Sequence, residues 1–327
     1  MTASALWPRC RVEALACQDS ENHSVGPISV QAFANDRLRF LLANLAAAQR
    51  ATRVIYDFAG TARAHVDLPF QKRPYAVWMH GWEIWGESAP KYLRAISRAQ
   101  LVLANSAYSV ARASGMLSRG IEVVTCPLGT LEDAAPEKIG PSEGPPTVML
   151  LGRADELFAK GHDLLIEVWP DVLAAVPDAK LLLVGGGNAI DKVRGLAALS
   201  PARHAIEIRG FVPDGALEAC WRRTTVFAML GFAEGFGLVY AEAMRRGLPV
   251  IASTEDAGQE INLEGKTGLN VSRKNKKRLT EALVLLLNDR DYARSLGAAG
   301  HALWKEKYSF SAFSERLVAA IGRFLAV

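Results

Sequence analysis

The fold can be inferred outward from residues 233–253, AEGFGLVYAEAMRRGLPVIAS. Before them, the apolar run from Thr225 to Leu230 is typical of a buried parallel strand. Gly235 and Gly237 predict a sharp turn, since glycine lets the backbone turn tightly and lets a ligand approach it. A helix is expected from about Leu238 to Arg246, because a Gly-Leu-Pro sequence ends it and two arginines complement its dipole.

Two carboxylates flank this predicted helix start. Glu234 precedes the helix, and Glu242 lies ~7 Å along its axis at ~1.5 Å per residue. The unpaired N–H groups of the first turn face the loop and suit an anion or sugar hydroxyls. Each glutamate alone is equally compatible with a solvated surface position. Their place between buried strands, where an unpaired carboxylate is costly, favours a binding role.

The ordered motifs Glu-Gly-Phe-Gly-Leu, Glu-Ala-Met and Gly-Leu-Pro-Val-Ile-Ala-Ser resemble the E-x7-E signature of retaining nucleotide-sugar glycosyltransferases, in particular family 4. The resemblance covers about residue 54 to the end and is strongest over 147–271. It implies the GT-B fold, with two Rossmann-like, doubly wound α/β domains facing a cleft. It also implies a UDP- or GDP-linked sugar as substrate, with no further cofactor and no metal.

Composition sets the broad class. A chain of 327 residues that is half hydrophobic can form two domains. No apolar run approaches the ~18–20 residues of a membrane-spanning helix, and Arg9, Arg11 and Glu13 stand where a signal peptide would be apolar. The four cysteines form no ligand cluster, which favours free thiols in the cytoplasm. The net charge of +4 comes with no nucleic-acid motif, so no nucleic-acid partner is expected.

The first half alternates short apolar strands with helix-length segments, which predicts a parallel sheet with ligands at the strands' carboxyl ends. A polar, turn-rich segment is expected over residues 18–29 and a helix from Phe33 to Gln49. The expected strands are Arg11–Cys17, Val54–Phe58, Tyr75–Met79, Leu101–Ala104 and Ile121–Thr125.

His80 follows one of these strands and precedes glycine, a position from which it can donate a hydrogen bond or a proton. A lone histidine is also compatible with a structural role. In the family a His-Gly at this place often faces the donor–acceptor cleft, and the resemblance therefore implies a catalytic role for His80. Ser106 is interpreted as the N-cap of the next helix.

The start of the chain departs from the family, whose members open with a strand and a glycine-rich loop. Here the first strand resembles the family's second, and only Gly26 precedes the Phe33 helix. Because the first strand of such a sheet is central, its absence would leave unpaired backbone groups. We therefore expect the N-terminal domain to lack one strand–helix unit, about 30 residues. Without that unit, part of the acceptor side and one donor-phosphate contact would be missing.

The expected domains are residues 1–135 on the acceptor side, 136–310 for the nucleotide sugar, and a helix over 311–327 that crosses back to the first domain. The Pro- and Gly-rich segment from Glu132 to Pro146 marks the boundary.

Arg153 and Lys160 lie where a strand ends and a helix begins, an unfavourable place for cations unless an anion lies between them. They are also compatible with ordinary surface residues. Gly152-Arg153 followed by Lys160-Gly161 resembles the family's diphosphate-binding pair, which implies a guanidinium fork and a point charge for the leaving group. Further donor contacts are implied for Gly235, Phe236, Gly237 and Leu238. The segment 206–221 resembles the region that holds the base, whereas the glycine run 185–187 is compatible with close approach of the nucleotide or with a simple turn.

The resemblance implies a retaining hexosyltransferase acting on a glycan or polyprenyl-linked acceptor in cell-surface polysaccharide synthesis. Arg153, Lys160 and the loop amides would stabilise the departing diphosphate, while Glu234 holds the sugar and Glu242 the ribose. The alternatives are a non-catalytic nucleotide-sugar-binding protein and a nucleotide-sugar epimerase. Arg37 and Arg39 on the Phe33 helix are compatible with peripheral contact at the inner face of the plasma membrane, or with a buried amphipathic helix.

Overall fold

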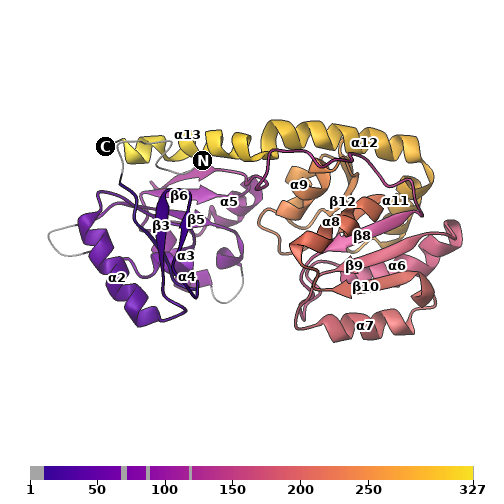
Figure 1. The fold of residues 1–327 in the computed structure, drawn as a ribbon, viewed down its shortest axis with the longest axis horizontal. Coiled ribbons are helices and arrows are strands. Elements are labelled where there is room, and N and C mark those ends of the chain that lie inside the picture. The colour runs from indigo at the N-terminus through magenta and orange to yellow at the C-terminus, as the bar shows by residue number, and fades with distance from the viewer. Residues whose placement is uncertain (1–10, 68–71, 86–88, 118–119, 327) are drawn as a thin grey trace. The chain divides into compact units, whose positions relative to one another are not determined.

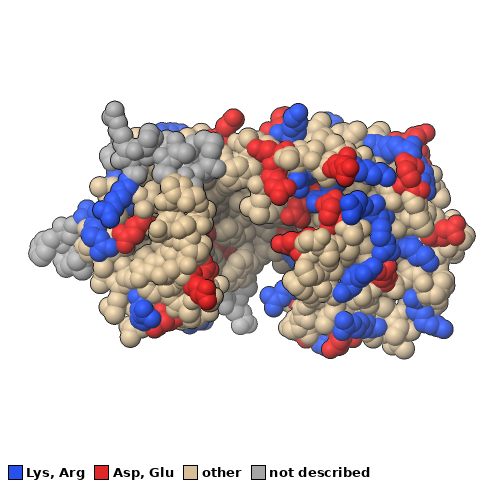
Figure 2. All heavy atoms as spheres, viewed as in Figure 1, with Lys and Arg blue, Asp and Glu red and all other residues tan. Residues whose placement is uncertain are grey.

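The computed structural model describes residues 11–67, 72–85, 89–117 and 120–326. The chain divides into two compact units (Figure 1). Unit 1 comprises Met1–Cys126 and Ser314–Val327, and unit 2 comprises Pro127–Phe313. On the visible face of unit 2 basic and acidic side chains are interspersed, whereas that of unit 1 carries fewer charges (Figure 2). No helix in the described ranges is both long and apolar enough to span a membrane.

Unit 2 contains a six-stranded parallel sheet in the order β10-β9-β8-β11-β12-β13. Its strands are β8 (Thr147–Leu151), β9 (Lys180–Val184), β10 (Ile206–Gly210), β11 (Val226–Met229), β12 (Val250–Ser253) and β13 (Gly268–Val271). The chain runs outward from β8 through β9 to β10 and then returns to β11, on the other side of β8. The order therefore reverses between β8 and β11, and α/β proteins bind ligands at the carboxyl ends of strands at such a switch point.

Helices cover both faces of this sheet, and the one expected from Leu238 to Arg246 is present with its end one residue earlier. They are α6 (His162–Ala175), α7 (Ile190–Leu199), α8 (Asp214–Arg223), α9 (Leu238–Arg245), α10 (Gly258–Ile261), α11 (Lys276–Asn288) and α12 (Arg290–Leu303), followed by the π turn η3 (Trp304–Tyr308). Alternate residues of β11 enter two separate cores, because successive strand side chains point to opposite faces. Val226 packs with Trp169 and Leu283, whereas Phe227 packs with Tyr240 and Trp304.

Unit 1 contains a four-stranded parallel sheet in the order β4-β5-β6-β7. Its elements are β4 (Val54–Tyr56), α3 (Ala59–Ala62), β5 (Tyr75–Met79), η1 (Trp82–Ile84), α4 (Ala89–Ile96), β6 (Leu101–Ala104), α5 (Ala107–Ala113) and β7 (Glu122–Thr125). The last helix, α13 (Phe310–Leu325), contributes its residues from Ser314 onward to this unit. There Arg53 donates from Nε to the Phe324 carbonyl at 2.9 Å.

The N-terminal region differs from expectation. The first strand, β1 (Ala14–Ala16), does not extend the four-stranded sheet but pairs with β3 (Ile28–Ala32) in a separate sheet. The segment expected to be turn-rich contains β2 (His23–Val25) and the start of β3, which form an antiparallel pair. A turn is present there at residues 26–27, but the strands beside it were not expected, because β2 is short and wholly exposed and no apolar alternation marks it.

The helix expected from Phe33 begins four residues later, as α2 (Arg37–Arg50). Asp36 caps it by accepting the Arg39 N–H at 3.0 Å, which fixes the start at Arg37. Ala34 and Asn35 have positive φ angles and so cannot continue a helix backward. The ring of Phe33 is instead buried edge-on against Phe40, which accounts for its helix-like spacing.

Candidate functional site

The switch point of unit 2 brings two predicted cations beside one glycine. Arg153 follows β8, is exposed, and has no ion pair in the described part of the chain. A Cβ atom added to Gly152 would lie only 3.1 Å from the Lys160 Cγ atom, so the lysine stem packs over this glycine. The Leu230 N–H donates to the Lys160 carbonyl at 3.1 Å, which ties the lysine loop to the end of β11.

Lys160 and Glu234 form an ion pair between their ammonium and Oε1 atoms. Their side chains are 20% and 18% exposed, so the pair is partly shielded from water. Burial lowers the pKa of Lys160, while Asp256 and Asp155 oppose that change. The predicted catalytic carboxylate and the predicted diphosphate cation are therefore partners in this structure.

Asp256 is a third charged residue of this cluster, and sequence reasoning did not single it out. Its side chain is fully buried after β12, and Oδ1 accepts the Gly258 N–H at 2.9 Å. Oδ2 has no hydrogen-bond partner among the described residues and lies against Gly231, where a Cβ atom would collide with it. Burial raises the pKa of Asp256 from 3.8 to about 6, against the lowering effects of the Gly258 N–H and Lys160. The signal that could have revealed it is its position just after a buried strand.

The loop before α9 has the backbone geometry expected from its glycines. Gly237 has φ 87°, in the left-handed region, and directly precedes the helix. A Cβ atom there would lie 2.6 Å from the Tyr240 ring and 3.4 Å from Glu234 Oε2. The Phe236 side chain is buried against Tyr308, with ring centroids 5.9 Å apart. The backbone of Phe236, and not its side chain, is thus placed to contact a ligand.

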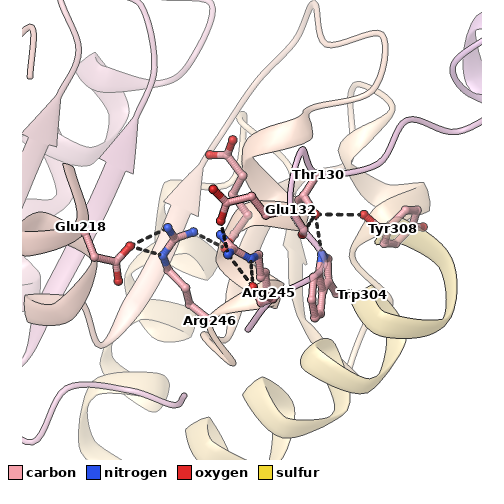
Figure 3. A network of polar contacts seen from close by, with 9 residues as sticks. Thr130, Glu132, Glu218, Arg245, Arg246, Trp304 and Tyr308 are labelled. Carbon is pink, nitrogen blue, oxygen red and sulfur yellow. Dashed lines mark hydrogen bonds and ion pairs between the residues drawn. The ribbon is translucent and has the colours of Figure 1, made fainter. Parts of the chain in front are cut away.

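Glu242 lies on α9, half-buried, and its carboxylate has no hydrogen bond or ion pair in the described part of the chain. Burial raises its pKa, and Arg246 and Arg245 act in the opposite direction. Arg246 pairs with Glu218 at 2.7 Å (Figure 3). It also donates to the Glu242 carbonyl at 3.0 Å and stacks 4.6 Å over the Trp221 ring. A half-buried carboxylate without a partner, on a helix held this firmly, is available to accept ligand hydroxyl groups.

The other end of this network holds the segment that enters unit 2 (Figure 3). Trp304 donates from Nε1 to the Thr130 hydroxyl at 2.9 Å, and the Thr130 N–H donates to the Tyr308 carbonyl at 2.8 Å. Arg245 pairs with Glu132 at 2.7 Å. Although its composition predicts a linker, the start of this segment is therefore fastened to α9 and η3.

A hollow of about 510 Å³ opens beside the Arg153 end of the site. It is lined by Leu151, Gly152, Arg153, Gly185, Gly186, Gly187 and Phe211. A Cβ atom on Gly185 would collide with the Gly152 carbonyl, so this glycine allows two loops to touch. Phe211 is 79% exposed and presents its ring at the edge of the hollow. The predicted glycine run and base region thus line one hollow.

Arg273 is a further residue that the sequence did not reveal. It donates to the carbonyls of Leu230 and Phe158, the latter at 3.5 Å, and lies 5.0 Å over the Phe232 ring. Its guanidinium is also 4.0 Å from Asp163. Arg273 therefore fastens the loop before Lys160 to the loop before Glu234. No local motif indicates this, because Arg273 lies in the segment after β13, far from both loops in the sequence.

His80 belongs to unit 1, and both of its ring nitrogens have partners. Nε2 lies 2.7 Å from the Asp57 carbonyl and Nδ1 lies 3.0 Å from the Asn105 side-chain amide. A carbonyl only accepts, so Nε2 carries the proton and Nδ1 accepts from Asn105. These two contacts fix the orientation of the ring, and its predicted catalytic role stays a proposal. The fully buried Glu83, also missed, accepts the His80 N–H at 3.1 Å.

The remaining polar predictions concern the cap and the thiols. Ser106 accepts the Ser109 N–H at 3.1 Å, which confirms it as the N-cap of α5. Cys17, Cys126 and Cys220 are free, and Cys10 lies outside the described residues. In the described ranges no three His, Cys, Asp or Glu side chains gather as a metal site requires.

Comparison with known proteins gives matches to one family and one fold. The family profile described as glycosyl transferases group 1 matches residues 132–302. A GDP-mannose-dependent monoacylated alpha-(1-6)-phosphatidylinositol monomannoside mannosyltransferase of Corynebacterium glutamicum is 32% identical over 62% of this chain and 54% of its own. A GDP-mannose-dependent alpha-(1-6)-phosphatidylinositol monomannoside mannosyltransferase of Mycolicibacterium smegmatis is 36% identical over 47% and 42%. The chain thus spans about half the length of the curated relatives it matches.

Solved structures match more of the chain at lower identity. Sucrose-phosphate synthase from Thermosynechococcus elongatus gives a TM-score of 0.78 at 20% identity, covering 96% of this chain and 88% of that one. Anabaena HepE, solved with UDP and glucose, gives 0.76 at 17% identity, covering 90% and 86%. At these identities the matches establish the fold.

Proposed function

The chain belongs to the glycosyl transferases group 1 family, and from this premise we propose that it is a retaining hexosyltransferase that uses a nucleotide-diphosphate sugar. Its two units with parallel sheets have the GT-B fold, as the sequence predicts. The observation that carries the proposal is the cluster at the β8–β11 switch point, where Lys160 and Glu234 meet beside Gly152.

The diphosphate is assigned to Arg153, Lys160 and the N-terminal end of α9. Arg153 is exposed without a partner in the described part of the chain, and it directly follows Gly152, over which the Lys160 stem packs. The free N–H groups after Gly237 add further donors at the positive end of the helix. These groups would stabilise the negative charge that builds on the leaving diphosphate as the glycosidic bond breaks, and such fixed donors supply a large part of catalysis.

The sugar and the ribose are assigned to the two glutamates. Glu234 would turn from Lys160 to the sugar hydroxyls once the diphosphate takes over the lysine. Glu242 would accept the ribose hydroxyls, which is supported by its half-buried carboxylate without a partner in the described residues. A diphosphate oxygen on the face of the sugar that the acceptor attacks would receive the proton of the acceptor hydroxyl. The glutamates therefore act as binding groups rather than as an acid and a nucleophile.

The base is assigned to the hollow beside Arg153. Its glycines leave backbone groups open to a ligand, and the exposed Phe211 ring offers an apolar face for stacking. Two curated relatives are named as GDP-mannose-dependent enzymes at 32% and 36% identity. We therefore assign GDP-mannose as the donor.

The acceptor is assigned to the phosphatidylinositol class because the same relatives are named for such acceptors. The outer face of α2 supports a membrane-borne acceptor: Leu38 and Leu42 are 66% and 58% exposed, and Arg37 and Arg39 are exposed beside them. An apolar stripe flanked by arginines suits the surface of an anionic membrane. The protein would then act at the cytoplasmic face of the membrane.

Lys160→Gln tests the proposal against the matched variant Lys192→Gln, which removes an exposed lysine on α7. GDP-mannose binding is measured by calorimetry, and transfer is measured with labelled GDP-mannose and vesicles that contain a phosphatidylinositol monomannoside. Lys160→Gln should lose both and Lys192→Gln neither. Unchanged GDP-mannose binding in Lys160→Gln would refute the diphosphate assignment. If the wild type binds GDP-mannose but transfers no sugar, the chain is a non-catalytic binding protein. If the wild type converts the sugar in the absence of acceptor, it is an epimerase.

A further inference from the structure

Three aromatic rings gather at the carboxyl end of the unit 1 sheet. Phe58 follows β4, Trp82 follows β5, and Tyr92 lies on α4. Phe58 and Trp82 are stacked with centroids 5.0 Å apart, and Tyr92 meets Trp82 edge-on at 5.4 Å. Because two of the rings come from the ends of neighbouring parallel strands, they lie on the edge where α/β sheets bind ligands.

This aromatic cluster is not a buried core. Trp82 is 50% exposed, although tryptophan is usually among the most buried side chains. Its stacking on Phe58 holds the indole in place while half of its surface stays in water. Gly60, beside Phe58, has no space for a side chain, because a Cβ atom there would collide with the Phe58 ring. The Trp82 ring is thus a fixed aromatic face that is open to solvent and can stack against a ligand.

The groups around the rings are polar and of both charges. The exposed Asp57 carboxylate accepts the Thr61 hydroxyl at 3.2 Å. The Arg63 guanidinium lies 5.8 Å over the Tyr92 ring, is exposed, and has no ion pair within the described ranges. An aromatic face attracts the weakly positive C–H groups of a saturated ring. A carboxylate accepts its hydroxyls, and a guanidinium binds an attached phosphate.

We propose that Phe58, Trp82 and Tyr92 form a platform that binds the polyhydroxylated six-membered ring of the acceptor, with Asp57 on its hydroxyls and Arg63 on its phosphate. This inference rests on the proposed function, since it names where that reaction's acceptor is held. The mixed charges favour a phosphorylated sugar or cyclitol over an apolar partner surface. The phosphatidylinositol class that the curated relatives are named for has this chemistry.

The test compares Trp82→Ala and Trp82→Phe with Met116→Ala, which removes an apolar side chain that is 49% exposed elsewhere in unit 1. With phosphatidylinositol monomannoside in vesicles, Trp82→Ala should raise the acceptor KM at least tenfold and leave the dissociation constant of GDP-mannose unchanged. Trp82→Phe should keep most of the acceptor affinity, because it retains an aromatic face. Met116→Ala should change neither value. An unchanged acceptor KM in Trp82→Ala would overturn the proposal.

A second measurement does not depend on catalysis. Soluble glycerophosphoinositol is titrated into the full chain, and binding is followed by isothermal calorimetry. Weaker binding of glycerophosphoinositol by Trp82→Ala and by Arg63→Gln than by the wild type supports the platform, even if no transfer is detected. A failure of the proposed function can therefore be told apart from a failure of this proposal. Equal binding by all variants would overturn it. Vesicles of phosphatidylcholine and phosphatidylglycerol contain no acceptor. If the wild type binds these vesicles and the Trp82→Ala variant does not, Trp82 is a membrane anchor instead.

Discussion

Replacing Asp256 with asparagine should stabilise unit 2 at neutral pH and change its stability much less at pH 4. Burial raises the pKa of the Asp256 carboxyl from 3.8 to about 6 in the folded chain. The folded state therefore holds the proton more tightly than the unfolded state. This contribution to stability is complete below pH 3.8 and is lost as the pH rises through about 6. At pH 7 the chain carries a buried charge that asparagine would not have.

The size of the effect follows from the two pKa values. A tenfold change in a protonation equilibrium is worth about 1.4 kcal/mol, so the difference between 3.8 and about 6 corresponds to about 3 kcal/mol at pH 7. For a unit of this size, that is a melting-temperature difference of about 6–12 °C. Asparagine keeps an oxygen for the Gly258 N–H, which already lies 2.9 Å from Oδ1.

Thermal unfolding of the wild type and of Asp256→Asn is followed by calorimetry at pH 4, 5, 6 and 7. The informative quantity is how the melting-temperature difference between the two proteins changes with pH, because any pH-independent cost of placing an amide beside Gly231 is the same at every pH and cancels. Asp171→Asn is the matched control, since it removes an exposed carboxylate on α6 that makes no ion pair in the described part of the chain. A difference between wild type and Asp256→Asn that is the same at pH 4 and pH 7 would refute the reasoning.

Three further outcomes are expected. Gly185→Ala should lower the melting temperature by more than 5 °C in a thermal scan, because φ is 125° and the new methyl group would collide with the Gly152 carbonyl. Burial lowers the His162 pKa to about 4, so protonation of this histidine opposes folding, and the free energy of unfolding of the wild type in urea titrations should fall by about 3 kcal/mol between pH 6.5 and pH 4. His162→Gln should abolish that fall. Arg246→Ala should cost about 1 kcal/mol in urea unfolding at pH 7, through loss of the partly buried pair with Glu218.

Much of the fold could be predicted because its strands are short apolar runs bounded by turn residues. The bounds of β5 and β6 are those predicted, and α9 ends one residue early. The N-terminal sheet could not be predicted, because the residues of β2 are all exposed and its pairing with β3 is decided by a two-residue turn. The polar composition of residues 18–29 therefore resembled a loop.

The candidate site was predictable where its residues follow a motif along the chain. Lys160 and Glu234, which are 74 residues apart, form an ion pair in the folded chain. Asp256 was missed because its importance depends on burial and on contact with Gly231. For His80, the residues that hold both ring nitrogens come from two other strands' ends, and no sequence spacing reveals that. Periodicity thus indicates elements, whereas the protonation state of a side chain depends on tertiary contacts.

The ion pair between Lys160 and Glu234 has a consequence for selectivity. Under the proposed assignment, an incoming anion must compete with Glu234 for the lysine, because the two side chains are paired in this structure. Inorganic phosphate or a bare nucleoside diphosphate would satisfy the lysine but leave a partly buried carboxylate without its partner, at the cost of an unmade hydrogen bond. An intact nucleotide sugar would compensate both sides of the exchange, because its hydroxyls would replace the ammonium at Glu234. After transfer of the sugar, the pair would re-form and so favour release of the nucleotide.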